Sequence, residues 1–269
     1  MSAPVFLAEG ASLGDYGIGS VFVLDGAEGR HAGVVQRRGP GERIDVVDGA
    51  GLRLEGVVES VDDGHVHLRV RGVVAEEPPV PVVTLVQALA KGDRDEQAIE
   101  AATETGVDAV VPWQAERSIV VWRGPRAAKS QAKWVATVRA AAKQARRARV
   151  PEVAEPVTTR QLAARVRDVA GAGGVVAVLH EEATTPLRSV PLPRVGAPAE
   201  APAGASAGAS PAPELLVVVG PEGGISAAEV DALTAAGAVT ARLGPHVMRT
   251  STAGPVAVAM LNERLGRWS

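Results

Sequence analysis

The hydrophobic positions over residues 1–76 follow the short, alternating pattern of β-strands. Turn residues separate the apolar runs, and Asp62, Asp63 and Gly64 have the composition of a hairpin turn. The pattern predicts strands at Val21–Leu24, Arg43–Val47, Leu52–Val61 and His65–Val74, with a helical stretch at Ala27–Arg38. These elements indicate a small barrel-like or sandwich-like module.

Three prolines mark the end of this module, at Pro78, Pro79 and Pro81. Proline removes an amide donor and stiffens the backbone, which is typical of a short linker between domains. We therefore predict a first domain at residues 1–76 and a second at residues 77–269.

After the prolines, helical periods alternate with fully apolar runs. The apolar runs predict strands at Val82–Gln87, Val107–Trp113, Val175–Leu179, Leu215–Val219 and Val239–Leu243. Helical spacing predicts three helices, at Asp93–Thr105, Ala127–Arg147 and Thr252–Arg267. Gly106 is expected to end the first, and hydroxyl residues are available to cap the third. The second carries a stripe of Trp134, Val135, Val138, Ala141 and Ala142 along one face. Because fully apolar strands are buried on both faces, the second domain is predicted to be α/β, with a mostly parallel sheet between helices.

Composition narrows the classes of function. The chain has 46% hydrophobic and 22% charged residues, a net charge of -3 and no cysteine, which excludes disulfide scaffolds, zinc ribbons and thiol catalysis. Only His65-x-His67 has metal-ligand spacing among the histidines, and it has no third ligand nearby in the sequence, so we expect no metal.

Neither a leader peptide nor a membrane-spanning run occurs, so we expect a cytoplasmic protein without membrane contact. Residues 195–213, almost wholly Ala, Pro, Gly and Ser, predict a flexible surface insertion.

A glycine-rich loop, Gly220–Gly224, directly follows one buried strand and precedes the capping box of Ser226 and Glu229. Open α/β sheets bind ligands at this end of their strands. The loop lacks G-x-G-x-x-G and the Walker lysine, and the Glu222 carboxylate would repel a pyrophosphate. A ribose diol, an adenine edge or a cation fits better, while a plain strand-to-helix turn remains the alternative.

A second Gly/Pro loop, Leu243–Ala253, follows the last predicted strand, and Arg249 is its only fixed positive charge. The alternative role for Arg249 is a surface salt bridge of little energetic weight.

Between Arg117 and Arg149 the chain carries ten basic residues and no Asp or Glu, which favours a polyphosphate backbone as partner. Lys91 and Arg94 flank a helix start at which Asp93 is the expected N-cap.

These motifs together resemble one family. The runs Lys91–Arg94, Ala101–Val107, Val111-Pro112 and Glu116–Ser118, the Gly220–Gly224 loop and the stretch from Leu243 to Thr250 are similar to those of the ribosomal RNA small-subunit methyltransferase E family, of the SPOUT class. Arg30-His31 and Gly41-Glu42 in the first domain also fit, so the resemblance covers nearly the whole chain. Lys143-Gln144 and Ser251 depart from the family pattern, which has Glu-Gln and Glu there.

The resemblance implies a PUA-like RNA-binding barrel followed by a SPOUT α/β domain with a carboxyl-terminal trefoil knot. It implies a homodimer that uses S-adenosyl-L-methionine to methylate N3 of a uridine in small-subunit (16S) ribosomal RNA, as naked RNA or in the assembled 30S subunit. Arg249 is the expected catalytic residue, stabilising charge on the uracil oxygens.

The resemblance assigns the cofactor-binding residues, and the resemblance together with the basic stretch indicates the RNA-binding residues. The implied cofactor-binding residues are Leu179, His180, Val219, Gly220, Pro221, Glu222, Gly223, Gly224, Leu243, Gly244, Pro245, Met248, Arg249, Thr250, Thr252 and Ala253. The expected RNA-binding residues are Arg30, His31, Lys91, Arg94, Arg117, Lys143, Gln144, Arg146 and Arg147. A SPOUT enzyme acting on another RNA, such as tRNA, and a non-catalytic ribosome assembly factor are the alternatives.

Overall fold

The computed structural model describes residues 3–8, 10, 12–194 and 212–268. The chain forms two compact units, the first from Met1–Pro78 with Arg139–Val150 and the second from Pro79–Val138 with Pro151–Ser269. The division falls inside one long helix, so a segment far along the sequence groups with the amino-terminal unit. The insertion predicted at 195–213 lies outside the described residues, apart from its last two.

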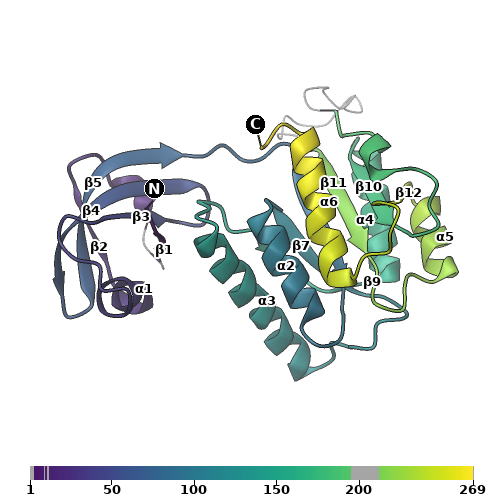
Figure 1. The fold of residues 1–269 in the computed structure, drawn as a ribbon, viewed down its shortest axis with the longest axis horizontal. Coiled ribbons are helices and arrows are strands. Elements are labelled where there is room, and N and C mark those ends of the chain that lie inside the picture. The colour runs from purple at the N-terminus through teal and green to yellow at the C-terminus, as the bar shows by residue number, and fades with distance from the viewer. Residues whose placement is uncertain (1–2, 9, 11, 195–211, 269) are drawn as a thin grey trace, which may run out of the picture. The chain divides into compact units, whose positions relative to one another are not determined.

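The first unit is built on a curled sheet with the strand order β1-β3-β4-β5-β2 (Figure 1). Its strands are β1 (Val5–Leu7), β2 (Val21–Leu24), β3 (Arg43–Val47), β4 (Leu52–Asp62) and β5 (His65–Ala75). All pairs are antiparallel except β1 with β3, which are parallel. The four predicted strands are confirmed, whereas β1 is too short to produce a readable pattern.

The interior of this unit is formed by alternate residues of its strands. Phe6, Ile44, Leu54 and Leu68 are almost completely buried in one cluster. Register shifts in the β4–β5 pair, between Glu55 and Gly56 and again after Val58, bend the sheet around this core. The helix predicted at Ala27–Arg38 is shorter: α1 covers Gly26–Arg30 and continues as a π-helical turn, η2 (His31–Val35).

The second unit contains a parallel sheet with the order β12-β10-β11-β6-β7-β8, on which β9 also pairs with β7. Its strands are β6 (Val82–Ala88), β7 (Ala109–Gln114), β8 (Glu152–Val153), β9 (Val157–Thr158), β10 (Val175–Leu179), β11 (Glu214–Val219) and β12 (Val239–Ala241). Its helices are α2 (Arg94–Glu104), α4 (Thr159–Gly171), α5 (Ala227–Ala235) and α6 (Thr250–Arg264), with the start of α3 (Pro125–Gln144). Short 3₁₀ turns occur at η1 (Leu13–Asp15) in the first unit and η3 (Leu187–Ser189) in the second.

The predicted parallel sheet between helices is confirmed, because every strand pair of this sheet is parallel and its central strands are buried. Helix α6 lies against α2 in Figure 1. The Asn262 amide of α6 donates hydrogen bonds to the carbonyls of Thr105 and Gly106, where α2 ends. Gly106 has a positive φ of 97°, as its predicted role in ending the helix requires.

Two details of the helices differ from the prediction. Val135 was expected in the buried stripe of α3 but is 38% exposed, because the stripe that packs is narrower and passes through Trp134 and Val138. The last helix has Arg249 at its N-cap and no side-chain cap. The hydroxyl of Thr250 is directed instead to a neighbouring strand end, so it is not available for capping.

Candidate functional site

The candidate site is the edge of the parallel sheet at which the strands end. From β6 the chain proceeds outward through β7 to β8, whereas β11 and β10 lie on the other side of β6. Such a reversal of strand order leaves a crevice between neighbouring loops, where open α/β sheets bind ligands. The loops after β6, β7, β10, β11 and β12 meet here and contain most of the residues predicted to bind the cofactor.

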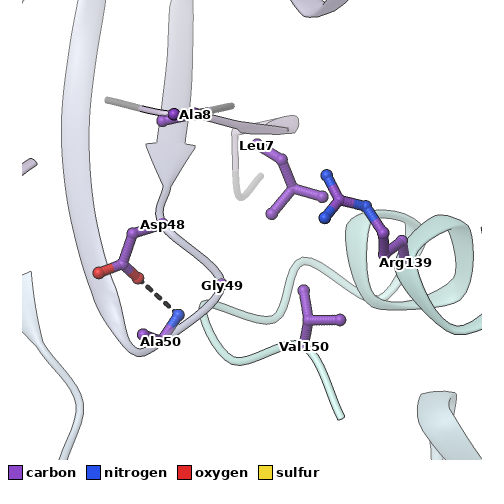
Figure 2. A pocket seen from close by; sticks show the side chains of 8 residues that line it. Leu7, Ala8, Asp48, Gly49, Ala50, Arg139 and Val150 are labelled. Atoms are coloured by element: carbon purple, nitrogen blue, oxygen red, sulfur yellow. Dashed lines mark hydrogen bonds between the residues drawn. The ribbon is translucent and has the colours of Figure 1, made fainter. Parts of the chain in front are cut away.

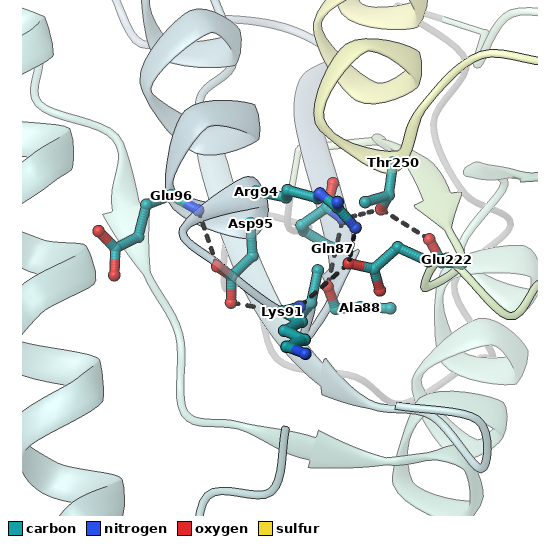
Figure 3. Close-up of polar contacts among 10 residues, drawn as sticks. Gln87, Ala88, Lys91, Arg94, Asp95, Glu96, Glu222 and Thr250 are labelled. Carbon is teal, nitrogen blue, oxygen red and sulfur yellow. Dashed lines mark hydrogen bonds and ion pairs between the residues drawn. The ribbon is translucent and has the colours of Figure 1, made fainter. Parts of the chain in front are cut away.

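Glu222 joins the loop after β11 to the loop after β6. Its Oε1 accepts a hydrogen bond from the Lys91 backbone amide at 3.1 Å and from Arg94 Nη1 at 2.8 Å (Figure 3). Burial raises the pKa of this carboxyl, but hydrogen bonds from its own backbone amide, Arg94 and the Lys91 amide outweigh burial and lower the pKa overall. Glu222 is therefore held as a carboxylate between two predicted RNA-binding residues.

Thr250 joins the start of α6 to β6 and β11. Its buried hydroxyl donates to the Gly220 carbonyl at 2.7 Å and accepts from Gln87 Nε2 at 2.9 Å (Figure 3). Gln87 is completely buried, and the same amide donates to the Ala88 carbonyl at 3.2 Å. Gln87 is absent from the predicted site residues, although a polar residue within an apolar strand was a signal that could have identified it.

The glycines of the Gly220–Gly224 loop have separate physical roles. A Cβ at Gly220 would lie 2.6 Å from Ile225 Cγ1, so only glycine fits where the chain turns back on itself. Gly224 has a positive φ of 73°. The Gly223 carbonyl accepts a hydrogen bond from Arg117 Nη1 at 3.0 Å, which ties the loop to the segment after β7.

A buried carboxylate, Glu229 in the first turn of α5, lies directly after the same loop and supports it. The predicted capping box is confirmed, since the Ser226 hydroxyl and the Glu229 carboxylate each accept the other's backbone amide. Glu229 Oε1 also accepts the Glu116 amide at 2.8 Å and the Thr159 hydroxyl at 2.7 Å. The Ser226 hydroxyl donates a hydrogen bond to Glu116 Oε2 at 2.6 Å. One side chain thus connects the ends of β7, β9 and β11, which the local capping motif did not predict.

The loops after β10 and β12 run side by side. The His180 amide donates to the Ala241 carbonyl at 3.0 Å, and Leu179 pairs with Ala241 in the sheet. A cavity of about 420 Å³ lies next to this pair. It is lined by Pro186, Leu187, Arg188, Arg242, Leu243, Gly244, Pro245 and Met260, of which Leu243, Gly244 and Pro245 belong to the predicted cofactor set.

The segment before α6 presents its side chains to solvent. Val247 is 78% exposed and Met248 36% exposed. The Arg249 side chain is also exposed and makes no hydrogen bond or ion pair within the described residues. Thr252 is exposed and Ala253 half-buried in the first turn of α6. Arg249 is therefore available to a bound molecule, as its expected catalytic role requires.

The expected RNA-binding residues divide between the two units. Lys91, Arg94 and Arg117 lie at the loop edge of the second unit, whereas the remaining six, Arg30, His31, Lys143, Gln144, Arg146 and Arg147, belong to the first. Lys143 forms a 2.5 Å ion pair with Glu28, whose other oxygen accepts the Leu7 amide. Lys143 thus stabilises the first unit, while Gln144 and Arg146 are exposed.

The first unit contains a larger cavity, of about 590 Å³, that includes none of the predicted site residues. Figure 2 shows Arg139 on one side and the turn at Asp48 on the other. Asp48 Oδ1 accepts hydrogen bonds from the amides of Ala50 and Leu52, at 2.7 and 3.0 Å, and so rigidifies that turn.

Within the described ranges, no group of three or more His, Cys, Asp or Glu side chains could hold a metal ion. Among the described helices, none is long and apolar enough to cross a bilayer.

The chain is similar in sequence to known RNA methyltransferases. A family described as the RNA methyltransferase domain matches residues 76–262. The ribosomal RNA small subunit methyltransferase E of Mycobacterium tuberculosis is 46% identical over 250 residues, which cover 93% of this chain and 89% of that protein. The protein of the same name from Bacillus subtilis is 31% identical over 242 residues, covering 90% of this chain and 89% of that one.

Solved structures agree with the predicted SPOUT-type α/β fold preceded by a small barrel-like domain. A methyltransferase of Legionella pneumophila, solved with bound SAM, aligns with a TM-score of 0.77 and 26% identity over 98% of each chain. The ribosomal RNA small subunit methyltransferase E of Neisseria gonorrhoeae, solved bound to S-adenosyl methionine, aligns with a TM-score of 0.76 and 24% identity over 98% of each chain, and supports the fold alone. The chain belongs to the ribosomal RNA small subunit methyltransferase E family.

Proposed function

We propose that this protein transfers a methyl group from S-adenosylmethionine to N3 of a uridine in small-subunit ribosomal RNA. The main support is the set of contacts by which Glu222 and Thr250 connect the loops after β6 and β11 with the start of α6. The family relationship supports the same chemistry, since the Legionella pneumophila methyltransferase carries bound SAM.

The residues of this edge are chemically suited to that cofactor. S-adenosylmethionine has no phosphate and carries a sulfonium charge, so a carboxylate such as Glu222 nearby is tolerated. Glycines let the loop backbone approach a nucleoside closely, and the bonds from Thr250 and Arg117 to the Gly220 and Gly223 carbonyls hold the loop in place. The residues that would hold the cofactor are Leu179, His180, the loop Val219–Gly224, Leu243–Pro245, Met248–Thr250, Thr252 and Ala253. When bound, the cofactor supplies an electrophilic methyl group with a good leaving group.

The chain's own residues would align the base and stabilise charge. N3 of a paired uridine is hidden, so the base must be unpaired or flipped out before it reaches the loops. As the N3 proton passes to solvent, negative charge would develop on the uracil oxygens. The methyl–N3 bond would form as the methyl–sulfur bond breaks, which would leave a neutral thioether as the product. Arg249 is exposed and without a partner in the described part of the chain, and its guanidinium would stabilise that charge. Alignment of the two reactants by the loops provides the remaining rate enhancement.

Four further features belong to this proposal. The carboxyl-terminal segment would form a trefoil knot, the active form would be a homodimer, and the protein would act in the cytoplasm on ribosomal RNA or the assembled 30S subunit. The first unit would act as a PUA-like RNA-binding domain, with Arg30, His31, Arg146 and Arg147 contacting the phosphate backbone.

The test is transfer of a labelled methyl group to 30S subunits that lack the modification, followed by mass spectrometry of the methylated nucleotide. Label at N3 of a small-subunit uridine is the expected result. Label found only in tRNA would replace the substrate in this proposal. An absence of transfer, together with no heat of binding when S-adenosylmethionine is added in a calorimeter, would indicate a non-catalytic RNA-binding protein.

A further inference from the structure

The segment between β7 and α3 combines exposed apolar side chains with arginines. Ile119 is 71% exposed and Val121 44% exposed, two residues apart on the same loop. Arg117 and Arg123 flank them and are exposed as well. An isolated exposed apolar residue needs no explanation, but this cluster lies in a stretch with ten basic and no acidic residues.

Hydrogen bonds hold this segment in a defined shape. Gln114, at the end of β7, donates from Nε2 to the Val120 carbonyl at 3.0 Å and accepts the Trp122 amide on Oε1 at 3.3 Å. The Trp122 ring meets the buried Trp134 ring edge-on, with centroids 5.4 Å apart and planes at 81°. Ile119 and Val121 are therefore presented to solvent by a fixed loop, not by a loose one.

The same segment is attached to the glycine loop. Arg117 donates to the Gly223 carbonyl at 3.0 Å, and its Cβ lies where a side chain on Gly223 would make contact. The Ser118 hydroxyl is buried without a hydrogen-bond partner in the described part of the chain, an arrangement that a bound molecule or a small shift of the loop would relieve.

The occupant must present apolar faces and negative charge together. Unstacked bases of single-stranded RNA do so, because every base has an apolar face and every nucleotide a phosphate. A second copy of this chain is disfavoured, since it would bring two basic segments together. We propose that Ile119, Val121 and the exposed part of Trp122 contact unpaired bases next to the target nucleotide. This inference rests on the proposed function and extends it to a surface outside the predicted site.

The test uses a double variant that carries both Ile119→Ser and Val121→Ser. Its control is Val239→Ser, because Val239 is also β-branched, is 39% exposed and lies at the other end of the sheet. Affinity is measured by fluorescence anisotropy for a short single-stranded RNA and for a duplex of the same sequence. We expect the double variant to bind the single strand about tenfold more weakly and the duplex almost unchanged, because only unpaired bases expose their faces.

The salt dependence separates base contacts from charge contacts. The double variant loses apolar contacts only, so the slope of log affinity against log salt concentration should be unaltered. Arg123→Ala removes a positive charge and should make that slope shallower. Equal weakening on both RNAs, no weakening on either, or loss of self-association in sedimentation would each overturn the inference. Methyl transfer by the unaltered protein is measured in parallel, so failure of the proposed function is seen separately from failure of this surface.

Discussion

The hydroxyl of Thr250 donates a hydrogen bond to the carbonyl of Gly220 at 2.7 Å, across 30 residues of sequence. The same hydroxyl accepts from the amide of Gln87, so the first residue of α6 is held against the ends of β6 and β11. The two loops predicted to bind the cofactor are thereby connected through one buried oxygen.

Thr250→Val replaces that hydroxyl with a methyl group of similar size. The Gly220 carbonyl and the Gln87 amide each lose a partner, so we expect a loss of about 1–3 kcal/mol in the free energy of unfolding. S-adenosylmethionine should also bind more weakly, because the glycine loop is no longer fixed. Urea denaturation and calorimetry measure the two effects. Thr250→Ser is the control and should retain both properties, whereas an unchanged Thr250→Val would remove this contact from the site.

The ion pair of Glu222 with Arg94 predicts a pH dependence. The folded state lowers the pKa of Glu222, so its stabilisation is present above the ordinary value of 4.5 and is lost as the pH falls through the lower folded value. Glu222→Gln should therefore reduce the melting temperature at neutral pH, and the difference from the unaltered protein should vanish well below pH 4.5. Glu100→Gln, at an exposed position on α2, is the matched control. A difference that stays constant with pH would contradict the assignment.

Glu229→Ala removes the acceptor shared by three loops. The Glu116 amide, the Thr159 hydroxyl and the Ser226 amide would lose this partner, the Ser226 amide in a buried environment and the other two in partly buried ones. We expect a loss of at least about 3 kcal/mol in the free energy of unfolding. Asp231→Ala, exposed on the same helix, should change stability little. Similar stability of the two variants in denaturant titrations would show that the network is not needed.

Arg249→Ala tests the expected catalytic residue. Its side chain is exposed, so the fold should be unaffected, while methyl transfer should fall by about 100-fold or more, as on removing a donor to a developing oxyanion. Single-turnover transfer of a labelled methyl group is the measurement. Arg167→Ala, an exposed arginine on α4, serves as the control. Retained activity in the Arg249 variant would exclude it from the mechanism.

Charge reversal at Arg146 and Arg147 tests the basic segment of the first unit. Arg146→Glu with Arg147→Glu should weaken RNA binding and flatten its salt dependence, because fewer counterions are released. Affinity for S-adenosylmethionine should not change, since the predicted cofactor loops belong to the other unit. Arg43→Glu with Arg71→Glu, exposed in the same unit, is the charge-matched control. A salt response that is flat in the unaltered protein would argue against the basic segment as an RNA contact.

Features encoded by neighbouring residues were predictable from the sequence by itself. Strands β3 and β10 have the predicted ends, Gly106 ends α2, and Ser226 with Glu229 forms the predicted capping box. Each depends on side-chain alternation or on hydrogen bonds within one helical turn, so a short stretch of sequence contains all the information needed.

Contacts between distant residues were decided only by the tertiary structure. Glu222 meets Arg94 across 128 positions because β11 lies beside β6 in the sheet. Glu229 meets Glu116 across 113 positions because only β6 lies between β11 and β7. The grouping of Arg139–Val150 with the first unit and the missing side-chain cap at Arg249 are of the same kind. Periodicity reports which face of an element is buried, but strand order and helix packing determine which buried or polar group it meets, and these arise only when the whole chain has folded.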